Sequence, residues 1–190
     1  KDGIHILMDM QGHSAKNRLP IFFHKPAPIQ ASWLAPGSTG IPEIDYFIGS
    51  SHITPKSEEK HYVEKVLRLP EISQCFTPPD FDVKINSLPA LKNNFITFGC
   101  VNNISKINDN VIALWSKILL SISNSKLLIK NQNLDNKKIT ENFLERFKKQ
   151  GISKNRLILR GGSITRKELL EVYNEIDIVL DPFPFQGNTS

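Results

Sequence analysis

Cysteine is nearly absent from this chain of 190 residues, which contains only Cys75 and Cys100. Two cysteines cannot form the disulfide framework of a small secreted domain, and neither lies in a Cys-x-x-Cys or Cys/His spacing that would bind a metal. We therefore expect two free thiols, a reducing, cytoplasmic compartment and no resident metal ion.

Long apolar segments and strong charge are also missing. No run approaches the roughly 20 apolar residues that span a bilayer, and no signal-peptide pattern is present, so we predict no membrane span. Lysine and arginine exceed acidic residues by only 24 to 19, a formal net charge of +5. Because the basic residues are scattered and lack interleaved aromatic side chains, we predict no nucleic-acid binding. A small anionic ligand fits this charge equally well.

Several motifs with a defined chemistry do not occur. The sequence has no Gly-x-Gly-x-x-Gly fingerprint, Walker loop, zinc-binding helix motif or nucleophile-elbow serine. No pair of carboxylates has a spacing that indicates a glycosidase. No internal repeat with a period of roughly 20 to 50 residues is found. These absences exclude the corresponding enzyme classes and a repeat array within this chain.

Residues 91–190 instead show regular alternation of strand and helix patterns. Short apolar runs predict strands at 95–99, 126–130, 156–160 and 176–181. The helices between them follow the 3.6-residue period: one is expected to be capped by Asp109, one to occupy 140–150 before Gly151, and one to begin with the capping box of Thr165 and Glu168. This order predicts an α/β fold with a Rossmann-like, doubly wound parallel sheet.

Residues 1–70 have a different organisation. Strands are predicted at 4–8, 29–34 and 44–48, separated by turns rich in glycine and proline. The proline-containing segment 71–90 is predicted to be a linker. Because few elements precede it, we expect the C-terminal part of one Rossmann-like domain at 1–70 and the first part of a second at 91–190.

Phosphate binding is the chemistry that the loops of the second region favour. Lys106 follows the strand 95–99 in a turn of small and polar residues, and the turn 186–190 follows the strand 176–181. Ligands of such sheets bind beyond the carboxyl ends of the strands, so both loops are expected at one edge. An ammonium group beside free backbone amides suits a diphosphate.

The histidines are the other candidates for chemistry. Strand alternation places His5 on the same face as Leu7 and Asp9. Two interpretations stay open for it: a core histidine bonded to a carbonyl group, or a functional side chain. His13, beside Gly12 in the following loop, is better placed to contact a substrate. Surface positions are predicted for His24, His52 and His61.

Short motifs distributed along the whole chain carry a resemblance to a known family. They are Asp2-Gly-Ile-His5, Asp9-Met-Gln-Gly-His13, Asn17-Arg-Leu19, Lys25-Pro-Ala-Pro-Ile-Gln30, Trp33-Leu34, Ser38-Thr-Gly40, Ile44-Asp-Tyr46, Arg68-Leu-Pro70, Phe98-Gly99, Asn102-Asn103, Lys106-Ile107 and Asp181-Pro-Phe-Pro-Phe185. In this order and spacing the chain resembles the catalytic region of the O-linked N-acetylglucosaminyltransferase and SPINDLY-like family.

The resemblance implies a glycosyltransferase-B architecture of two Rossmann-like domains, with tetratricopeptide repeats in the parent chain. It implies metal-independent, inverting transfer of a sugar, usually from UDP-N-acetylglucosamine, to Ser or Thr of a protein substrate, with no cofactor beside the nucleotide-sugar. Two alternatives stay open: transfer of fucose from GDP-fucose, as SPINDLY-like members do, and a non-catalytic nucleotide- or partner-binding module. The isolated chain is expected to be inactive.

The resemblance also implies roles for individual residues. Lys106 corresponds to the lysine that holds the donor diphosphate, and His5 to a histidine near the reaction centre that is a candidate general base. On the acceptor side it points to Gly12 and His13. Further donor contacts are implied for Asn103, Arg166, Gly187, Asn188, Thr189 and Ser190. The sequence departs from the family pattern at Leu169, where a histidine is usual, at Ser105, where some members have tyrosine, and in the segment 33–37, which is one residue shorter.

Overall fold

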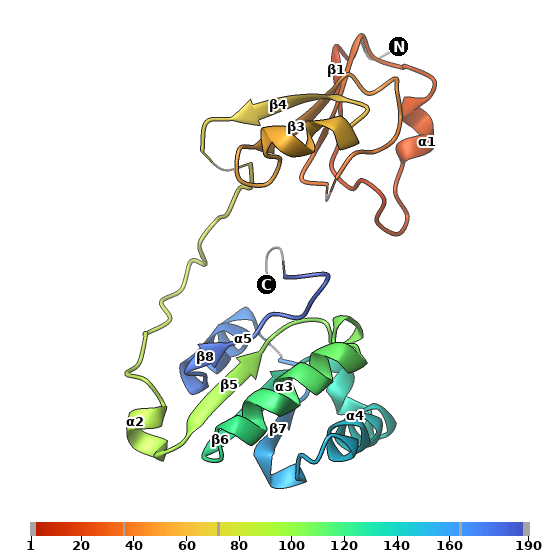
Figure 1. Ribbon diagram of the computed structural model, residues 1–190. Helices are drawn as coiled ribbons and strands as arrows, with labels where there is room; N and C mark the ends of the chain where they lie inside the picture. Colours follow the sequence, from red (N-terminus) through yellow and green to blue (C-terminus); the bar gives the residue numbers. More distant parts are fainter. Residues whose placement is uncertain (1–2, 36, 72, 164, 188–190) are drawn as a thin grey trace. The chain divides into compact units, whose positions relative to one another are not determined.

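The chain forms two compact units, Lys1–Pro78 and Pro79–Ser190, in a computed structural model that describes residues 3–35, 37–71, 73–163 and 165–187 (Figure 1). Each unit is built around a four-stranded sheet in which all neighbouring strands run parallel. Within the described residues, no helix has both the length and the apolar character needed to cross a membrane.

The first unit has the strand order β1-β2-β3-β4. Its elements are β1 (Ile6–Asp9), α1 (Leu19–Phe22), β2 (Ile29–Trp33), β3 (Tyr46–Ser50), the 3₁₀ turn η1 (Lys56–His61) and β4 (Lys65–Leu69). The three predicted strands are confirmed within about two residues of their bounds. The fourth, β4, was not predicted, because Lys65 and Arg68 interrupt its apolar pattern.

The two faces of this first sheet differ in burial. On one face Leu7 packs against a small core of Leu19, Phe22, Ile41 and Ile44 that includes both buried residues of α1. On the opposite face, the paired residues Ile6 and Ile29 are both exposed, as are Met8 and Leu67. Parallel sheets usually bury both faces, whereas in this unit one sheet face is only partly covered by the described residues.

Both ends of the predicted linker 71–90 contact a unit. Near its start, the Trp33 indole N–H donates to the Ser73 carbonyl at 2.6 Å, within the first unit. Near its end, the Asn174 side chain accepts from the Asn86 amide at 3.1 Å and donates to the Lys84 carbonyl at 2.8 Å, within the second. The boundary between the two units, at Pro78 and Pro79, lies between these two contact regions.

The second unit has the strand order β7-β6-β5-β8. Its strands are β5 (Ile96–Cys100), β6 (Ser125–Lys130), β7 (Leu157–Arg160) and β8 (Ile178–Val179). Its helices are α2 (Ala90–Asn93), α3 (Asp109–Ser121), α4 (Lys137–Lys149) and α5 (Arg166–Glu171), and its 3₁₀ turns are η2 (Ile104–Lys106), η3 (Gln132–Asp135), η4 (Lys154–Arg156) and η5 (Val172–Glu175).

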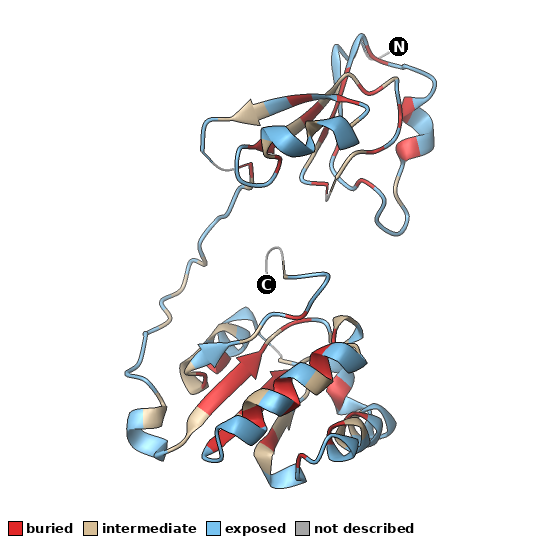
Figure 2. Ribbon diagram, viewed as in Figure 1, coloured by how far each residue is buried: buried red, intermediate tan, exposed pale blue. Residues whose placement is uncertain are grey.

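One face of the second sheet packs against α3 and α4 to form the largest core of the described residues, and buried stretches of these elements are red in Figure 2. This core includes the buried indole of Trp115. The other face packs Leu128 against Val172 and Ile176. Gly99 allows this contact, because a Cβ atom there would lie 2.3 Å from the Ile176 side chain. Both sheet faces of this unit therefore have apolar partners.

The helix boundaries of the second unit partly follow the predictions. The capping box of Thr165 and Glu168 is confirmed, and Gly151 has the positive φ of 81° expected beyond a helix. The cap of α3 is Asn108 rather than Asp109, and α4 begins at Lys137 instead of residue 140. In both helices an asparagine side chain accepts hydrogen bonds from the first-turn amides, which moves the start upstream.

The last predicted strand, 176–181, was too long. Only Ile178 and Val179 pair with β5 in regular register. The carboxylate of Asp177 accepts from the amides of Ala90 and Thr97, both at 2.8 Å. The Asp177 amide also donates to the Thr97 carbonyl at 2.9 Å, so Asp177 fastens the start of β5 with both its side chain and its backbone.

A candidate anion pocket at the carboxyl edge of the second sheet

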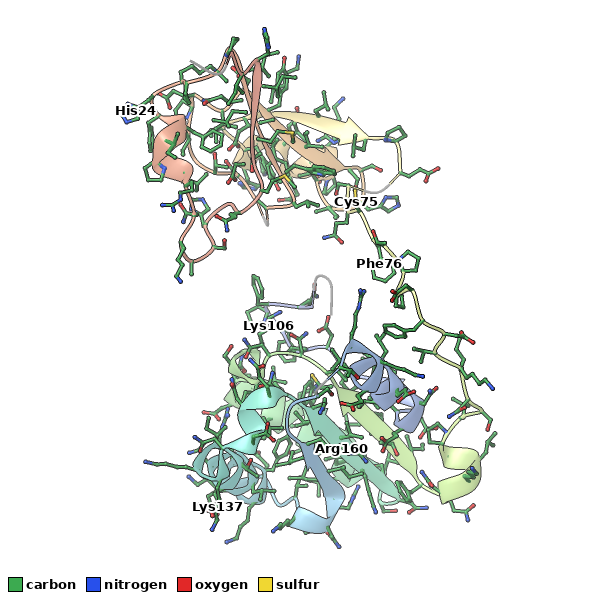
Figure 3. All side chains as sticks on the ribbon, turned by 180° about the vertical axis from the view of Figure 1, so that it is seen from behind. His24, Cys75, Phe76, Lys106, Lys137 and Arg160 are labelled. Atoms are coloured by element: carbon green, nitrogen blue, oxygen red, sulfur yellow. The ribbon has the colours of Figure 1, made fainter. Side chains whose placement is uncertain are left out.

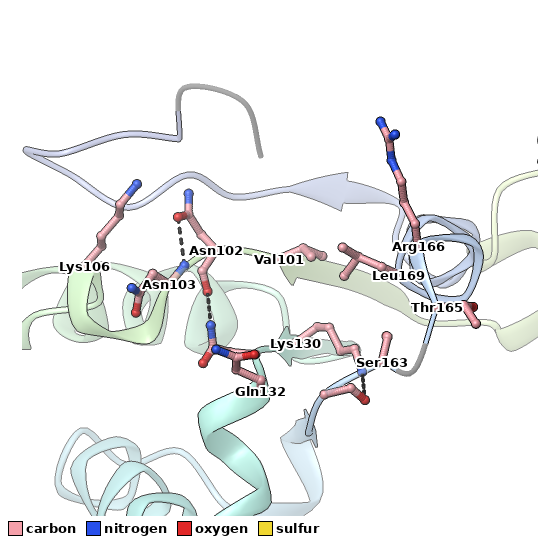
Figure 4. Close-up of a pocket in the computed structure, with 12 residues that line it drawn as sticks. Val101, Asn102, Asn103, Lys106, Lys130, Gln132, Ser163, Thr165, Arg166 and Leu169 are labelled. Atoms are coloured by element: carbon pink, nitrogen blue, oxygen red, sulfur yellow. Dashed lines mark hydrogen bonds between the residues drawn. The ribbon is translucent and has the colours of Figure 1, made fainter. Parts of the chain in front are cut away.

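The strand order of the second unit reverses at β5, because β6 and β7 lie on one side of it and β8 on the other. In doubly wound sheets this reversal opens a crevice at the carboxyl ends of the strands, where ligands bind. A cavity of about 650 Å³ lies beside it, lined by residues that follow β5, β6 and β7 and by the start of α5 (Figure 4). Its lining residues are Val101, Asn102, Asn103, Lys106, Lys130, Asn131, Gln132, Gly162, Ser163, Thr165, Arg166 and Leu169.

The loops after β5 and β8 meet at this crevice, as predicted. Lys106 Nζ donates to the Gln186 carbonyl at 3.0 Å and lies 4.8 Å from the centre of the Phe185 ring. Asn108 adds a second link, because its side-chain amide donates to the Phe183 carbonyl at 3.1 Å. The ammonium group of Lys106 is thus held at the switch point by neutral groups, with no carboxylate partner among the described residues.

Asp181 organises the loop after β8. Its carboxylate accepts from the Gly187 amide at 2.9 and 3.1 Å and from the Asn102 side chain at 3.2 Å. The amide of Gly187, a predicted donor contact, is therefore occupied in this structure. The other predicted parts of the diphosphate cap, Asn188, Thr189 and Ser190, lie outside the described residues.

The remaining predicted donor-side residues line the same cavity. Asn103 caps η2 through a hydrogen bond from the Ser105 amide at 3.1 Å, and Arg166 is the exposed first residue of α5. Leu169, which replaces a histidine of the family pattern, supplies apolar lining together with Val101. The structure thus brings Asn103, Lys106 and Arg166 together around one cavity.

Lys130 also lines this cavity and was not among the predicted residues. It is the last residue of β6 and only 7% exposed. The sequence carried a signal for it: a lysine at the carboxyl end of an apolar strand, which is the edge where ligands of such sheets bind. In the sequence prediction Lys130 is only the last residue of the strand 126–130.

The predicted acceptor-side residues belong to the first unit. His5 precedes β1 and is exposed, so its interpretation as a core histidine is wrong. Gly12 has a φ of 52°, and its amide donates to the Asp9 carboxylate at 2.9 Å. His13 is exposed, with its Nε2 atom 3.3 Å from the Ser38 carbonyl oxygen. Gly12 and His13 thus share a loop that starts from the carboxyl end of β1.

Buried carboxylates hold the loops of the first unit. Asp9, 4% exposed, also accepts from the Gln11 amide at 3.2 Å and from the Ser32 hydroxyl at 3.1 Å. Glu64, equally buried, accepts from the Thr39 amide and the Ser38 hydroxyl, both at 2.7 Å. These carboxylates give the loop ends of this unit a negative character that the cavity of the second unit lacks.

Both cysteines are free thiols, as predicted, and they differ in environment. Cys75 is exposed, whereas Cys100 lies in the core, where burial raises the pKa of its thiol to about 12. Among the described residues, no group of three His, Cys, Asp or Glu side chains is arranged to hold a metal ion. The surface position predicted for His24, His52 and His61 is confirmed, and His24 is labelled in Figure 3.

Known proteins resemble both the sequence and this geometry. Residues 1–77 match the model of glycosyl transferase family 41. The chain is 35% identical over 191 residues to the probable UDP-N-acetylglucosamine–peptide N-acetylglucosaminyltransferase SPINDLY of Eustoma exaltatum subsp. russellianum, an alignment that covers 100% of this chain and 21% of the relative. The chain belongs to the O-linked N-acetylglucosaminyltransferase and SPINDLY-like family.

Two further relatives of this family agree. The SEC protein of Arabidopsis thaliana, with the same enzyme description, is 32% identical over 139 residues, covering 67% of this chain and 14% of the relative. An O-GlcNAc transferase mutant from Thermobaculum terrenum superimposes with a TM-score of 0.85 at 35% identity, covering 99% of this chain and 35% of that one. The predicted α/β, glycosyltransferase-B fold class is confirmed. The chain spans about a fifth of the length of the SPINDLY relatives.

Proposed function

We propose that this chain is part of a protein O-glycosyltransferase and that its second unit binds the diphosphate of a nucleotide-sugar. The observation that carries the proposal is Lys106, an ammonium group without a carboxylate partner in the described chain, held at the switch point of a Rossmann-like sheet beside a cavity of about 650 Å³. Arg166 adds a second positive charge to the lining. Such a site favours an anion, and the family of the chain indicates which class of anion.

In the proposed reaction a protein hydroxyl attacks the sugar, and negative charge grows on the departing nucleoside diphosphate. Lys106 lies where an ammonium group can stabilise that charge, so the reaction needs no metal ion. A single preorganised donor of this kind can lower a barrier by about 3 kcal/mol. The acceptor-side roles of His5, Gly12 and His13, including His5 as general base, stay predictions.

UDP-N-acetylglucosamine is the proposed donor, because the names of the SPINDLY and SEC relatives specify it. These names do not favour the GDP-fucose alternative. The tetratricopeptide repeats, the cytoplasmic location and the inactivity of the isolated chain stay predictions.

The proposal is tested by calorimetric titration of the full-length protein with UDP-N-acetylglucosamine, UDP-glucose and GDP-fucose. We expect heat with the first, and a loss of transfer of about 10²-fold in Lys106→Ala, by analogy with the removal of one preorganised donor. Lys137→Ala is the matched control, because this lysine, labelled in Figure 3, is in the same unit with its side chain 91% exposed and is not among the residues that line the cavity.

Two outcomes would count against the proposal. The absence of binding to all three donors would favour the non-catalytic alternative. Undiminished transfer by Lys106→Ala would remove Lys106 from the donor site even if the enzyme is active. Heat with GDP-fucose alone would keep the enzyme class and change the donor.

A further inference from the structure

Lys130 carries a positive charge in a buried position. It is the only lysine or arginine among the buried residues of the described chain. Every ion pair found in the described residues uses another cation: Lys25, His61, Arg68, Lys137, Arg146, Lys148, Arg160 or Lys167. Burial of an ammonium group is costly when no opposite charge accompanies it. The charge of Lys130 is therefore left without a carboxylate partner in this part of the chain.

Hydrogen bonds satisfy Lys130 only in part. Its Nζ atom donates to the carbonyl oxygens of Gly161 and Gly162, the latter at 2.6 Å. An ammonium group has three N–H donors, so one has no acceptor among the residues that the structure describes. The carboxylate of Asp135 reaches the same loop but accepts from the Gly162 amide at 2.9 Å instead. The two carbonyl groups orient the ammonium without neutralising it.

The cavity beside Lys130 indicates where an acceptor for its third N–H group can bind. Its side chain lines the same cavity as Lys106, Asn103 and Arg166, and it emerges from the carboxyl end of the neighbouring strand, β6 (Figure 4). A buried charge is screened by water much less than the exposed charge of Arg166. The low exposure of the Lys130 side chain therefore strengthens its attraction for an anion in this cavity.

We infer that Lys130 is an anion-binding residue of this pocket and contacts a phosphate oxygen of the ligand with its third N–H group. The inference rests on the proposed function for the identity of the ligand as a nucleoside diphosphate, but its electrostatic basis holds for any diphosphate. In this arrangement Lys106 approaches the ligand from the loop after β5 and Lys130 from the end of β6. The bound ligand supplies the negative charge that pairs with Lys130, because no side chain of the described residues supplies one.

Calorimetric titration of the full-length protein with inorganic diphosphate, UDP and uridine tests this role. Lys130→Met removes the charge and keeps the length of the side chain. We expect it to weaken diphosphate and UDP by about tenfold or more, as for a lost charge-assisted hydrogen bond, and to leave uridine within about twofold. Lys130→Arg should keep most of the affinity. Lys126→Met, the same change at the opposite end of β6, should have no effect.

Thermal unfolding of each variant shows whether the unit still folds. If Lys130→Met does not, Lys130→Gln replaces it, because an amide can still donate to Gly161 or Gly162 without a charge, and the same loss is expected. Equal weakening of UDP and uridine, or unchanged binding of diphosphate, would overturn the inference. A wild-type protein that binds diphosphate but no nucleotide-sugar would contradict the proposed function, while the comparison of Lys130 variants with diphosphate would remain decisive for Lys130.

Discussion

The two units differ in the charged groups at the loop ends of their sheets. In the first unit the buried carboxylates of Asp9 and Glu64 collect backbone amides and hydroxyls. In the second, the cavity lining contains Lys106, Lys130 and Arg166, and no aspartate or glutamate of the described residues. A phosphate-bearing ligand is repelled by the first arrangement and attracted by the second. This difference supports the proposal that the second unit binds the anionic substrate, although the family model matches only residues 1–77.

The units also differ in how their sheets are covered. The second sheet has apolar partners on both faces, whereas the first exposes Ile6, Met8, Ile29 and Leu67 on one face. We therefore expect the second unit to be the more stable one when the chain is studied alone. The following experiments test the two contrasts, beginning with the largest expected effect.

The cysteines allow opening of the second unit to be followed separately, because Cys100 is buried there and the exposed Cys75 serves as an internal reference. At pH 8 a pKa near 12 instead of 9.0 lowers the thiolate fraction of Cys100 by about 10³-fold, and burial blocks access as well. We expect iodoacetamide to label Cys75 rapidly and Cys100 only after the second unit unfolds. Mass spectrometry of the labelled chain in increasing urea measures this. Labelling of Cys100 in the native chain at a rate near that of Cys75 would show that the second unit opens readily.

Asp9→Ala should destabilise the first unit. The change leaves the Gly12 amide and the Ser32 hydroxyl without their acceptor, which we expect to cost about 2 kcal/mol of unfolding free energy. Urea unfolding measured by circular dichroism gives the size of the effect. Asp9→Asn should cost less, because one side-chain oxygen still accepts.

The location of this effect is as informative as its size. Protection of Cys100 from labelling should be unchanged in Asp9→Ala if the units unfold independently. Glu58→Ala, in the same unit with its side chain 55% exposed, is the control and should change stability little. If Asp9→Ala lowered the urea concentration at which Cys100 becomes labelled as much as it lowered the unfolding midpoint of the first unit, the two units would share one cooperative transition.

Asp45→Asn should have the smallest effect and a characteristic pH dependence. Hydrogen bonds from Lys25 Nζ at 2.6 Å and from the Gln30 amide at 2.7 Å lower the pKa of Asp45 below its ordinary 3.8. The ionised carboxylate therefore stabilises the fold above pH 3.8, and this contribution disappears as the pH falls through the lowered pKa. Because the pair is partly exposed, we expect less than about 1 kcal/mol at pH 7.

Urea midpoints of wild type and Asp45→Asn, measured from pH 7 down into the acid range, check this. The two proteins should differ at pH 7 and converge below pH 3.8. A difference that stays constant across this range would assign the effect of the substitution to packing rather than to charge.

Periodicity and helix signals predicted most of the second unit, because its apolar strands and capped helices repeat regularly. They failed at β4, where Lys65 and Arg68 interrupt the apolar pattern, and at β8, where only Ile178 and Val179 pair with β5 in regular register. Lys106 was identified because it follows a strand in a small-residue turn. Lys130 was missed because its burial depends on Gly161 and Gly162, a loop that only the folded chain brings to it.

The sequence has two tryptophans, and the fold gives one to each unit. Trp115 is 2% exposed in the large core, whereas Trp33 is half-buried and hydrogen-bonded to the Ser73 carbonyl. An indole in an apolar core emits at shorter wavelength than one that shares its surroundings with water. The intrinsic fluorescence of the chain therefore contains one tryptophan signal from each unit, and the two signals are separable by wavelength.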